Sequence, residues 1–108
     1  MDIINRQQLK AKLDASDDFV LIDVVEAEAF EEFHLPKARS VPLGDDFVQR
    51  MRLAFPRQDL EVVVHCRDGN CPKAHQAAEA LLAAGYRKVS AYEAGRQDWR
   101  QAGLPVVF

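Results

Sequence analysis

Residues 61–78 read EVVVHCRDGNCPKAHQAA, and this stretch combines a strand, a short loop and the start of a helix. The part from Glu61 to Cys66 contains three consecutive valines, and a continuous β-branched run of this length is typical of a strand buried on both faces. Pro72 is favoured at the first position of a helix, because its missing N–H is not needed there. Apolar residues then recur at helical spacing, at Ala74, Ala77, Ala78 and Leu81. The stretch therefore predicts a buried strand and a helix, joined by a loop that Cys66 and Cys71 bracket.

The loop and the helix that follows it are expected to stabilise a negative charge on Cys66. A helix start presents unpaired backbone N–H groups and the positive end of the helix dipole, and a tight loop whose N–H groups converge binds anions. Cys66 ends the strand at the edge where open α/β sheets place their ligand crevices. We therefore expect a reactive thiolate with a lowered pKa. The alternative is an ordinary small apolar residue that ends a core strand.

The whole chain has the length and composition of one globular domain over residues 1–108. Hydrophobic residues make up 48% and charged residues 29%, an ordinary balance for such domains. The net charge is −3 and the basic residues are scattered, so neither a nucleic-acid surface nor a membrane patch is expected. No apolar run approaches the ~20 residues that a membrane helix needs. The start, MDIINRQQLK, lacks the pattern of a secretory signal, and we expect a cytoplasmic protein.

Both cysteines of the chain lie in the one loop. In a reducing compartment this pattern favours catalytic or redox chemistry over a structural disulfide. Zinc prefers four Cys or His ligands at characteristic spacings, and the chain offers only His34, His65 and His75 besides the cysteines. We therefore predict no metal site.

Strand-like and helix-like segments alternate along the chain. Strands are expected at 3–4, 19–24, 40–43, 61–66 and 88–92, and helices at 6–14, 26–33, 46–55, 72–84 and after Gly95. The early helix has Asn5 as its cap, and Gly85 stands where a helix takes a left-handed cap. This alternation predicts an α/β fold with a parallel sheet of about five strands and helices on both faces.

Several segments, in their order and spacing, resemble a known family. They are LIDVVEAEAF, HLPKARSVPL, VVVHCRDGN, LLAAGYRKVSAYEAGRQDW and QAGLPV. Together they resemble a single-domain rhodanese, the sulfurtransferase homology domain, almost from end to end. The rhodanese-like fold that this implies agrees with the parallel α/β sheet expected from the pattern.

The resemblance implies a two-step transfer of sulfur without a metal or an organic cofactor. Cys66 attacks the outer sulfur of a small anionic donor such as thiosulfate and becomes a persulfide. The sulfur then passes to a thiol, to cyanide or to a sulfur-accepting protein. The six-residue loop from Cys66 to Cys71 is similar to loops that take sulfur substrates, whereas related phosphatase loops are one residue longer and end in an arginine.

The resemblance also assigns the neighbours of Cys66. Arg67 is the one cationic side chain of the loop and is expected to bind the donor anion, with a solvated charge as the alternative. Asp68, Gly69 and Asn70 are expected to bind substrate through backbone N–H groups, with Gly69 permitting the turn. Cys71 completes this set as a loop residue and as a possible resolving thiol. It could equally be a small residue at the N-cap of the helix.

Asp23 and His34 are expected to support the loops by hydrogen bonds, and His65, next to Cys66 on a strand, is expected to point to the opposite side. Many family members have arginine where this chain has Val25, so Asp23 should be paired differently here. The rival function is a non-catalytic or redox-sensing module of the same fold. In that module, Cys66 and Cys71 would form a reversible disulfide, or the domain would only bind a partner.

Overall fold

The computed structural model describes all residues, 1–108, and contains one sheet of five parallel strands. The strands are β1 (Asp2–Ile4), β2 (Phe19–Asp23), β3 (Ala38–Ser40), β4 (Glu61–His65) and β5 (Lys88–Tyr92). The helices are α1 (Arg6–Asp14), α2 (Ala27–Glu32), α3 (Phe47–Ala54), α4 (Lys73–Ala83) and α5 (Gly95–Gln101). The strand order is β1-β5-β4-β2-β3, so β4 lies at the centre. The predicted parallel α/β fold is confirmed.

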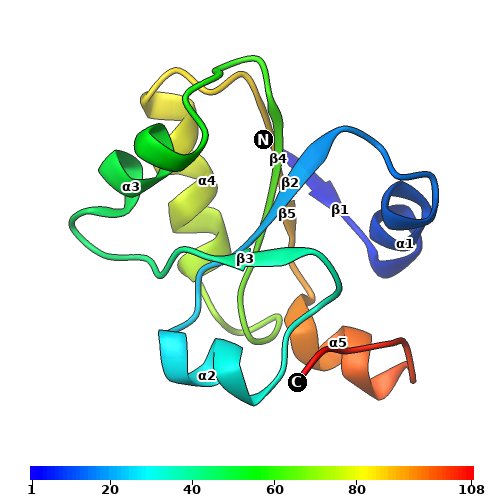
Figure 1. The fold of residues 1–108 in the computed structure, drawn as a ribbon. Coiled ribbons are helices and arrows are strands. Elements are labelled where there is room, and N and C mark those ends of the chain that lie inside the picture. Colours follow the sequence, from blue (N-terminus) through cyan, green and yellow to red (C-terminus); the bar gives the residue numbers. More distant parts are fainter.

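Helices cover both faces of the sheet (Figure 1). On one face, α3 and α4 pack against a core that includes Val62, Val64 and Leu81. On the other face, α1 and α5 pack against a second core that includes Leu9, Val63 and Trp99. Because β4 contributes to both cores, its unbroken valine run is buried on both sides. The helix α2 lies beyond the carboxyl ends of the strands (Figure 1).

Local sequence signals account for several element boundaries. Asn5 caps α1 in a capping box, because its side chain accepts from the N–H of Gln8 while the Gln8 side chain accepts from the N–H of Asn5. Gly85, which follows the C-cap residue of α4, has φ +103° and is the expected left-handed cap. The alanines of α4 face the core as their spacing predicts.

Most predicted elements differ from the structure by one residue at one or both ends, and one differs by more. The third strand is Ala38–Ser40 rather than 40–43. Val41 and Leu43 still donate to carbonyl groups at the end of β2, so position 42 faces the open edge of the sheet, where proline is tolerated because no ladder donor is needed. The helix α4 begins at Lys73, one residue after Pro72.

None of the helices combines the length and the hydrophobicity that a membrane crossing requires.

Candidate active site

Cys66 follows the last residue of β4 and lies at the carboxyl edge of the sheet. Only 3% of the residue is exposed. It lines a cavity of about 290 Å³ between the segment after β2, the cysteine loop and the start of α4. The central strand therefore delivers Cys66 to a hollow at the edge where parallel sheets bind ligands.

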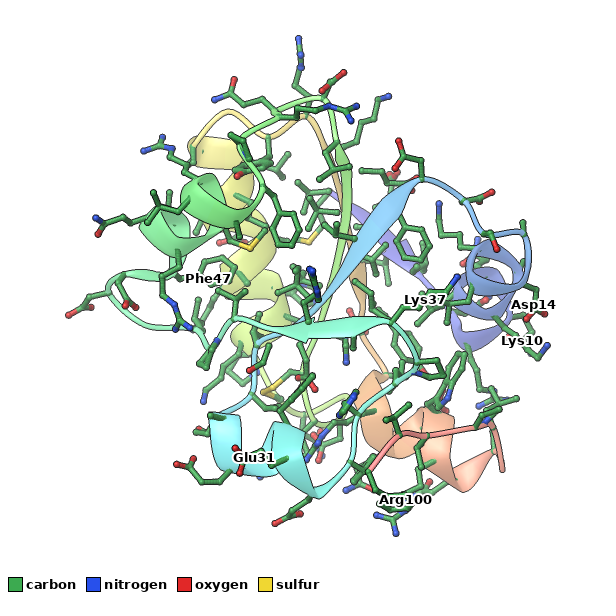
Figure 2. All side chains as sticks on the ribbon, viewed as in Figure 1. Lys10, Asp14, Glu31, Lys37, Phe47 and Arg100 are labelled. Atoms are coloured by element: carbon green, nitrogen blue, oxygen red, sulfur yellow. A yellow bond between two sulfur atoms is a disulfide. The ribbon has the colours of Figure 1, made fainter.

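Cys66 and Cys71 form a disulfide, with their Cα atoms 6.2 Å apart. Figure 2 shows it as a yellow bond between two sulfur atoms. The second sulfur can thus turn inward across the six-residue loop. The alternative role of Cys71 as the helix N-cap is wrong, because Pro72 occupies that position and no side chain caps the helix.

The backbone of the loop is only partly free to bind an anion. The N–H of Asn70 donates to the Asp68 carboxylate at 3.0 Å, and the N–H of Cys71 donates to the Asp68 carbonyl at 3.2 Å. The N–H donors expected at Asn70 and at the end of the loop are therefore satisfied inside the loop in this state. Asp68 acts as an internal acceptor, a role that the sequence analysis did not assign to it.

The glycine on which the loop depends is not the expected one. Gly69 has no positive φ, and a Cβ built there would meet nothing within 4 Å, so the turn does not require glycine at this position. Gly95, at the start of α5, has φ +77°, and a Cβ there would lie 2.7 Å from the Arg67 carbonyl carbon and from the Asp68 nitrogen. Glycine at 95 thus allows α5 to touch the loop. The sequence marked Gly95 only as the entry to a helix.

The first turn of α5 fixes the direction of two loop peptides. The N–H of Arg96 donates to the carbonyl of Cys66 at 3.1 Å, and the N–H of Gln97 donates to the carbonyl of Arg67 at 2.9 Å. All peptide bonds are trans, and the C=O and N–H of a trans peptide point in opposite directions. The N–H groups of Arg67 and Asp68 therefore point away from α5. They donate to no other group of the protein, and neither does the N–H of Gly69, so these three loop donors remain available to an anion.

Two cationic side chains line the cavity, one more than the loop itself contains. The Arg67 side chain is 64% exposed and its Nε lies 3.5 Å from the Asp68 carboxylate. Lys73, on the first turn of α4, lies 2.6 Å from the Glu26 carboxylate. The hydrogen bond from Lys73 is the main cause of the lowered pKa of Glu26. The sequence analysis assigned no role to Lys73, and only the fold brings it to the cavity.

Asp23 and His65 lie on the face of the sheet opposite to Cys66 and are both fully buried. The Asp23 carboxylate accepts from the N–H of Val25 at 3.2 Å, and its other oxygen lies 3.6 Å from His65 Nε2. This oxygen and both ring nitrogens of His65 make no hydrogen bond in the protein, so the different pairing of Asp23 expected from Val25 stays a prediction. His65 points away from Cys66, as predicted, and its ring lies 6.4 Å from that of Tyr92.

His34 joins the end of α2 to the end of the chain. Its ring stacks on Phe30 at 4.0 Å, and its Nδ1 lies 3.2 Å from the Phe30 carbonyl. Its backbone exchanges two hydrogen bonds with Val107. These contacts are structural, and His34 does not line the cavity.

Arg96 is a buried cation that the sequence analysis missed, with 3% of the residue exposed. Its Nη1 donates to the carbonyl groups of Ala29 and Phe33, each at 2.6 Å, and its guanidinium lies 4.3 Å from the centre of the Phe33 ring. The side chain of Arg96 holds α2 while its backbone N–H holds Cys66. One residue of α5 thus fixes two walls of the site.

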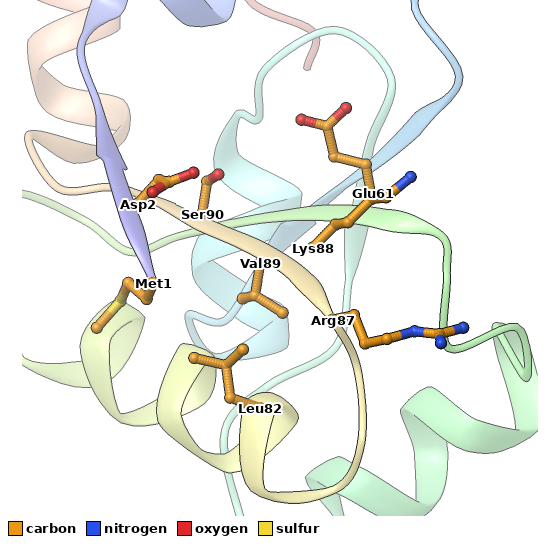
Figure 3. A pocket seen from close by; sticks show the side chains of 8 residues that line it. All are labelled: Met1, Asp2, Glu61, Leu82, Arg87, Lys88, Val89 and Ser90. Atoms are coloured by element: carbon orange, nitrogen blue, oxygen red, sulfur yellow. The ribbon is translucent and has the colours of Figure 1, made fainter.

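A second and larger cavity, of about 370 Å³, lies at the amino ends of β4 and β5. Figure 3 shows side chains of both charges around it, with Asp2 and Glu61 opposed by Arg87 and Lys88. It contains no cysteine, and no three His, Cys, Asp or Glu side chains gather in the structure as metal ligands would. Cys66 and the free backbone donors therefore make the cavity of about 290 Å³ the candidate active site.

The amino-acid sequence matches the family model of the rhodanese-like domain over residues 5–102. The chain is 33% identical over 105 residues to the HTH-type transcriptional regulator Rv0324 of Mycobacterium tuberculosis, covering 97% of this chain and 44% of that protein. It is 28% identical over 96 residues to the putative sulfur carrier protein YrkF of Bacillus subtilis, covering 89% and 49%. The chain thus spans less than half the length of each of these curated relatives.

Solved structures share the fold. The rhodanese-like domain of the Alr3790 protein from Anabaena sp. superposes with a TM-score of 0.87 at 22% identity, covering 99% of this chain and 79% of that one. The thiosulfate sulfurtransferase from Pseudomonas aeruginosa superposes with a TM-score of 0.85 at 25% identity, covering 99% of this chain and 20% of that one. The match of the family model to most of the chain and the shared fold lead to one conclusion: the chain belongs to the sulfurtransferase-like family of rhodanese-like domains.

Proposed function

We propose that this domain is a sulfurtransferase of the rhodanese type, with Cys66 as its nucleophile. The Cys66 thiolate attacks the outer sulfur of an anionic donor such as thiosulfate, the sulfur–sulfur bond of the donor breaks, and sulfite leaves with the bonding electron pair. The outer sulfur of the resulting persulfide then passes to a thiol or to cyanide. The observation that carries this proposal is Cys66 at the carboxyl end of the central strand, in a cavity edged by two cations.

The cavity suits a small dianion in three respects. Its volume of about 290 Å³ is close to the lower end of the range for small-molecule sites, roughly 300 Å³. The N–H groups of Arg67 and Asp68 are free to donate, and one well-placed donor is typically worth about 3 kcal/mol in a transition state. The side chains of Arg67 and Lys73 add positive charge at the rim.

The names of two similar proteins support the same chemistry. One relative is called a putative sulfur carrier protein and one structural neighbour a thiosulfate sulfurtransferase. By analogy, the physiological acceptor of this domain is a thiol, either a small molecule or a cysteine of another protein. We do not propose a non-catalytic or purely redox-sensing module, because neither of these two proteins points to one.

Transfer requires Cys66 as a free thiolate, so the disulfide is the resting oxidised state and not the acting one. We therefore expect the domain to work in a reducing compartment such as the cytoplasm. Without prior reduction the wild type should be inactive, whereas Cys71→Ser, which cannot form the loop disulfide, should need no reduction.

The decisive experiment measures thiocyanate formed from thiosulfate and cyanide. Wild type, Cys66→Ser and Cys71→Ser are reduced, desalted without oxygen and assayed side by side. Thiocyanate should form catalytically with Cys71→Ser, which cannot close the loop disulfide, and fall to the uncatalysed background with Cys66→Ser. A rate for Cys71→Ser no higher than that of Cys66→Ser would remove Cys66 as the nucleophile, and with it the proposal.

A further inference from the structure

The persulfide on Cys66 would form beside a second thiol. Cys71 reaches the Sγ atom of Cys66 in this structure, with a Cα–Cα distance of 6.2 Å, inside the usual range for disulfides of about 4.4–6.8 Å. After sulfur loading, that same Sγ becomes the inner sulfur of the persulfide. Cys71 is therefore placed to attack the inner sulfur, and no rearrangement beyond the observed loop is needed.

We propose that Cys71 resolves the Cys66 persulfide and makes the domain a donor of hydrosulfide, an inference that rests on the proposed function. The Cys71 thiolate attacks the inner sulfur, a bond forms between the two Sγ atoms, and the bond to the outer sulfur breaks. The outer sulfur leaves as hydrosulfide with the bonding electron pair. The persulfide supplies the oxidising equivalent, so the step needs no external oxidant.

An external dithiol closes the cycle by reducing the Cys66–Cys71 disulfide. The balance is one thiosulfate and one dithiol in, and one sulfite, one hydrosulfide, one oxidised dithiol and one proton out. On this second route, beside transfer to an external thiol, the terminal acceptor is a reducing dithiol that carries no sulfur. The need for a dithiol as acceptor distinguishes this activity from the transfer of sulfur to cyanide.

Burial favours the internal thiol over an external one. Only 3% of Cys66 is exposed, whereas Cys71 is half-buried beside it at the cavity wall. An external thiol must enter the cavity to reach the persulfide, but Cys71 is held next to it by the loop. An intramolecular thiol of this kind acts at an effective concentration far above that of free thiols.

The loop and its surroundings also fit the leaving group. Hydrosulfide leaves as an anion into the cavity that Arg67 and Lys73 border. The turn that Asp68 makes with the N–H groups of Asn70 and Cys71 holds the loop closed, with the second sulfur near the first. These internal hydrogen bonds cost the loop two anion donors, and they position Cys71 in return.

The test is a single turnover without any acceptor. Reduced wild type and Cys71→Ser are mixed with one equivalent of thiosulfate in the absence of oxygen, and sulfite, hydrosulfide and intact protein mass are measured. The wild type should release both sulfite and hydrosulfide and lose two hydrogen atoms. Cys71→Ser should stop at the persulfide, which is one sulfur atom heavier than the free thiol. Its release of hydrosulfide should be at least about a hundredfold slower than that of the wild type, since the intramolecular step is gone.

A second donor separates this proposal from the function on which it rests. Inorganic polysulfide loads thiols without catalysis, so wild type, Cys66→Ser and Cys71→Ser are also treated with it and then desalted. The wild type should end as the disulfide, while the two single-cysteine variants keep their added sulfur. This result supports attack of Cys71 on the persulfide even if thiosulfate yields no sulfite. A wild type that keeps a persulfide next to a free thiol overturns it. Absence of sulfite with thiosulfate contradicts only the proposed donor.

Discussion

Gly95 of α5 lies directly against the peptide that joins Arg67 to Asp68, so close that a Cβ at 95 would stand 2.7 Å from two of its backbone atoms. Backbone atoms of a loop that is itself hydrogen-bonded to α5 cannot move aside cheaply. The close approach is therefore what allows α5 to grip the loop that carries Cys66.

Gly95→Ala should destabilise the domain and reduce sulfur transfer. The φ of +77° at this residue costs a non-glycine residue about 1–2 kcal/mol, and the overlap with the loop adds to this. Gly103→Ala is the matched control, because its φ is +76° but nothing lies within 4 Å. Urea unfolding should show a larger loss in the free energy of unfolding for Gly95→Ala than for Gly103→Ala. Only Gly95→Ala should lower the rate of thiocyanate formation. Equal losses of stability in the two variants would mean that the contact between residue 95 and the loop does not contribute to the effect.

Gly69→Ala should be nearly neutral, within about 0.5 kcal/mol, as for an ordinary surface substitution. No atom lies near the added methyl group, and the residue has no positive φ. Unfolding curves and the Michaelis constant for thiosulfate measure the effect. A large loss would restore the turn role that the sequence suggested for this glycine.

Lys73 and Glu26 should act on thiosulfate binding in opposite directions. Lys73→Met removes a cation from the cavity rim and should raise the Michaelis constant, whereas Glu26→Gln releases Lys73 from its partner and should lower it. Each change should be about two- to fivefold, the size expected of an exposed charge interaction, and should fade at high salt.

The control for these two variants is Lys10→Met. Lys10 makes a surface ion pair of the same 2.6 Å length with Asp14 on α1, away from the cavity (Figure 2). It should leave the Michaelis constant unchanged. If Lys10→Met raised the Michaelis constant as much as Lys73→Met, the effect would come from the overall charge of the protein and not from the cavity.

Arg96→Met should destabilise the domain by about 3 kcal/mol, since two buried carbonyl groups lose a charged donor. Arg100 provides the comparison, because it stacks on the same Phe33 ring at 4.5 Å and its guanidinium makes no hydrogen bond to those carbonyls. Arg100→Met should cost well under 1 kcal/mol. Similar losses in thermal or urea unfolding would assign the effect to stacking instead.

The two tyrosines should make the domain less stable in alkali. Burial and the hydrogen bond to Asp98 raise the pKa of Tyr92, and burial raises the pKa of Tyr86, both above the ordinary value of 10.0. Neutral tyrosine is thus favoured in the folded state, so the stabilisation is complete below pH 10 and is lost as the pH rises above it. Each tyrosine should remove about 1.4 kcal/mol per pH unit there.

Absorbance of phenolate during pH titration checks this directly, because the chain has only these two tyrosines. The folded protein should show little phenolate near pH 10, and most should appear on unfolding. Tyr92→Phe should flatten the alkaline decline of stability measured in urea. Normal titration of both residues in the folded protein would contradict the expectation.

Patterns local in sequence predicted the fold well. The valine run of β4 and the alanine spacing of α4 are periodic signals, and strand burial and helix faces follow from them directly. The position of Cys66 at the carboxyl edge of a central strand could likewise be predicted, because parallel sheets align the ends of their strands.

Side-chain and backbone partners in the site could not be predicted in this way. Gly95 and Arg96 are about thirty residues from Cys66 along the chain, and their roles exist only because α5 packs against the loop. Lys73 looks like any solvated helix residue until the fold brings Glu26 beside it. The sequence also left undecided whether the sulfur of Cys71 can turn inward.

By itself, the sequence determined the parallel α/β sheet, the order of its elements and a cysteine at the carboxyl end of its central strand. These features depend on hydrophobic periodicity, glycine and proline, whose effects act over a few residues. Only the tertiary structure decided which backbone donors stay free, which cations reach the cavity and that the two sulfurs meet. Those depend on contacts between distant segments, and the geometry of such contacts is set by the packing of the whole domain.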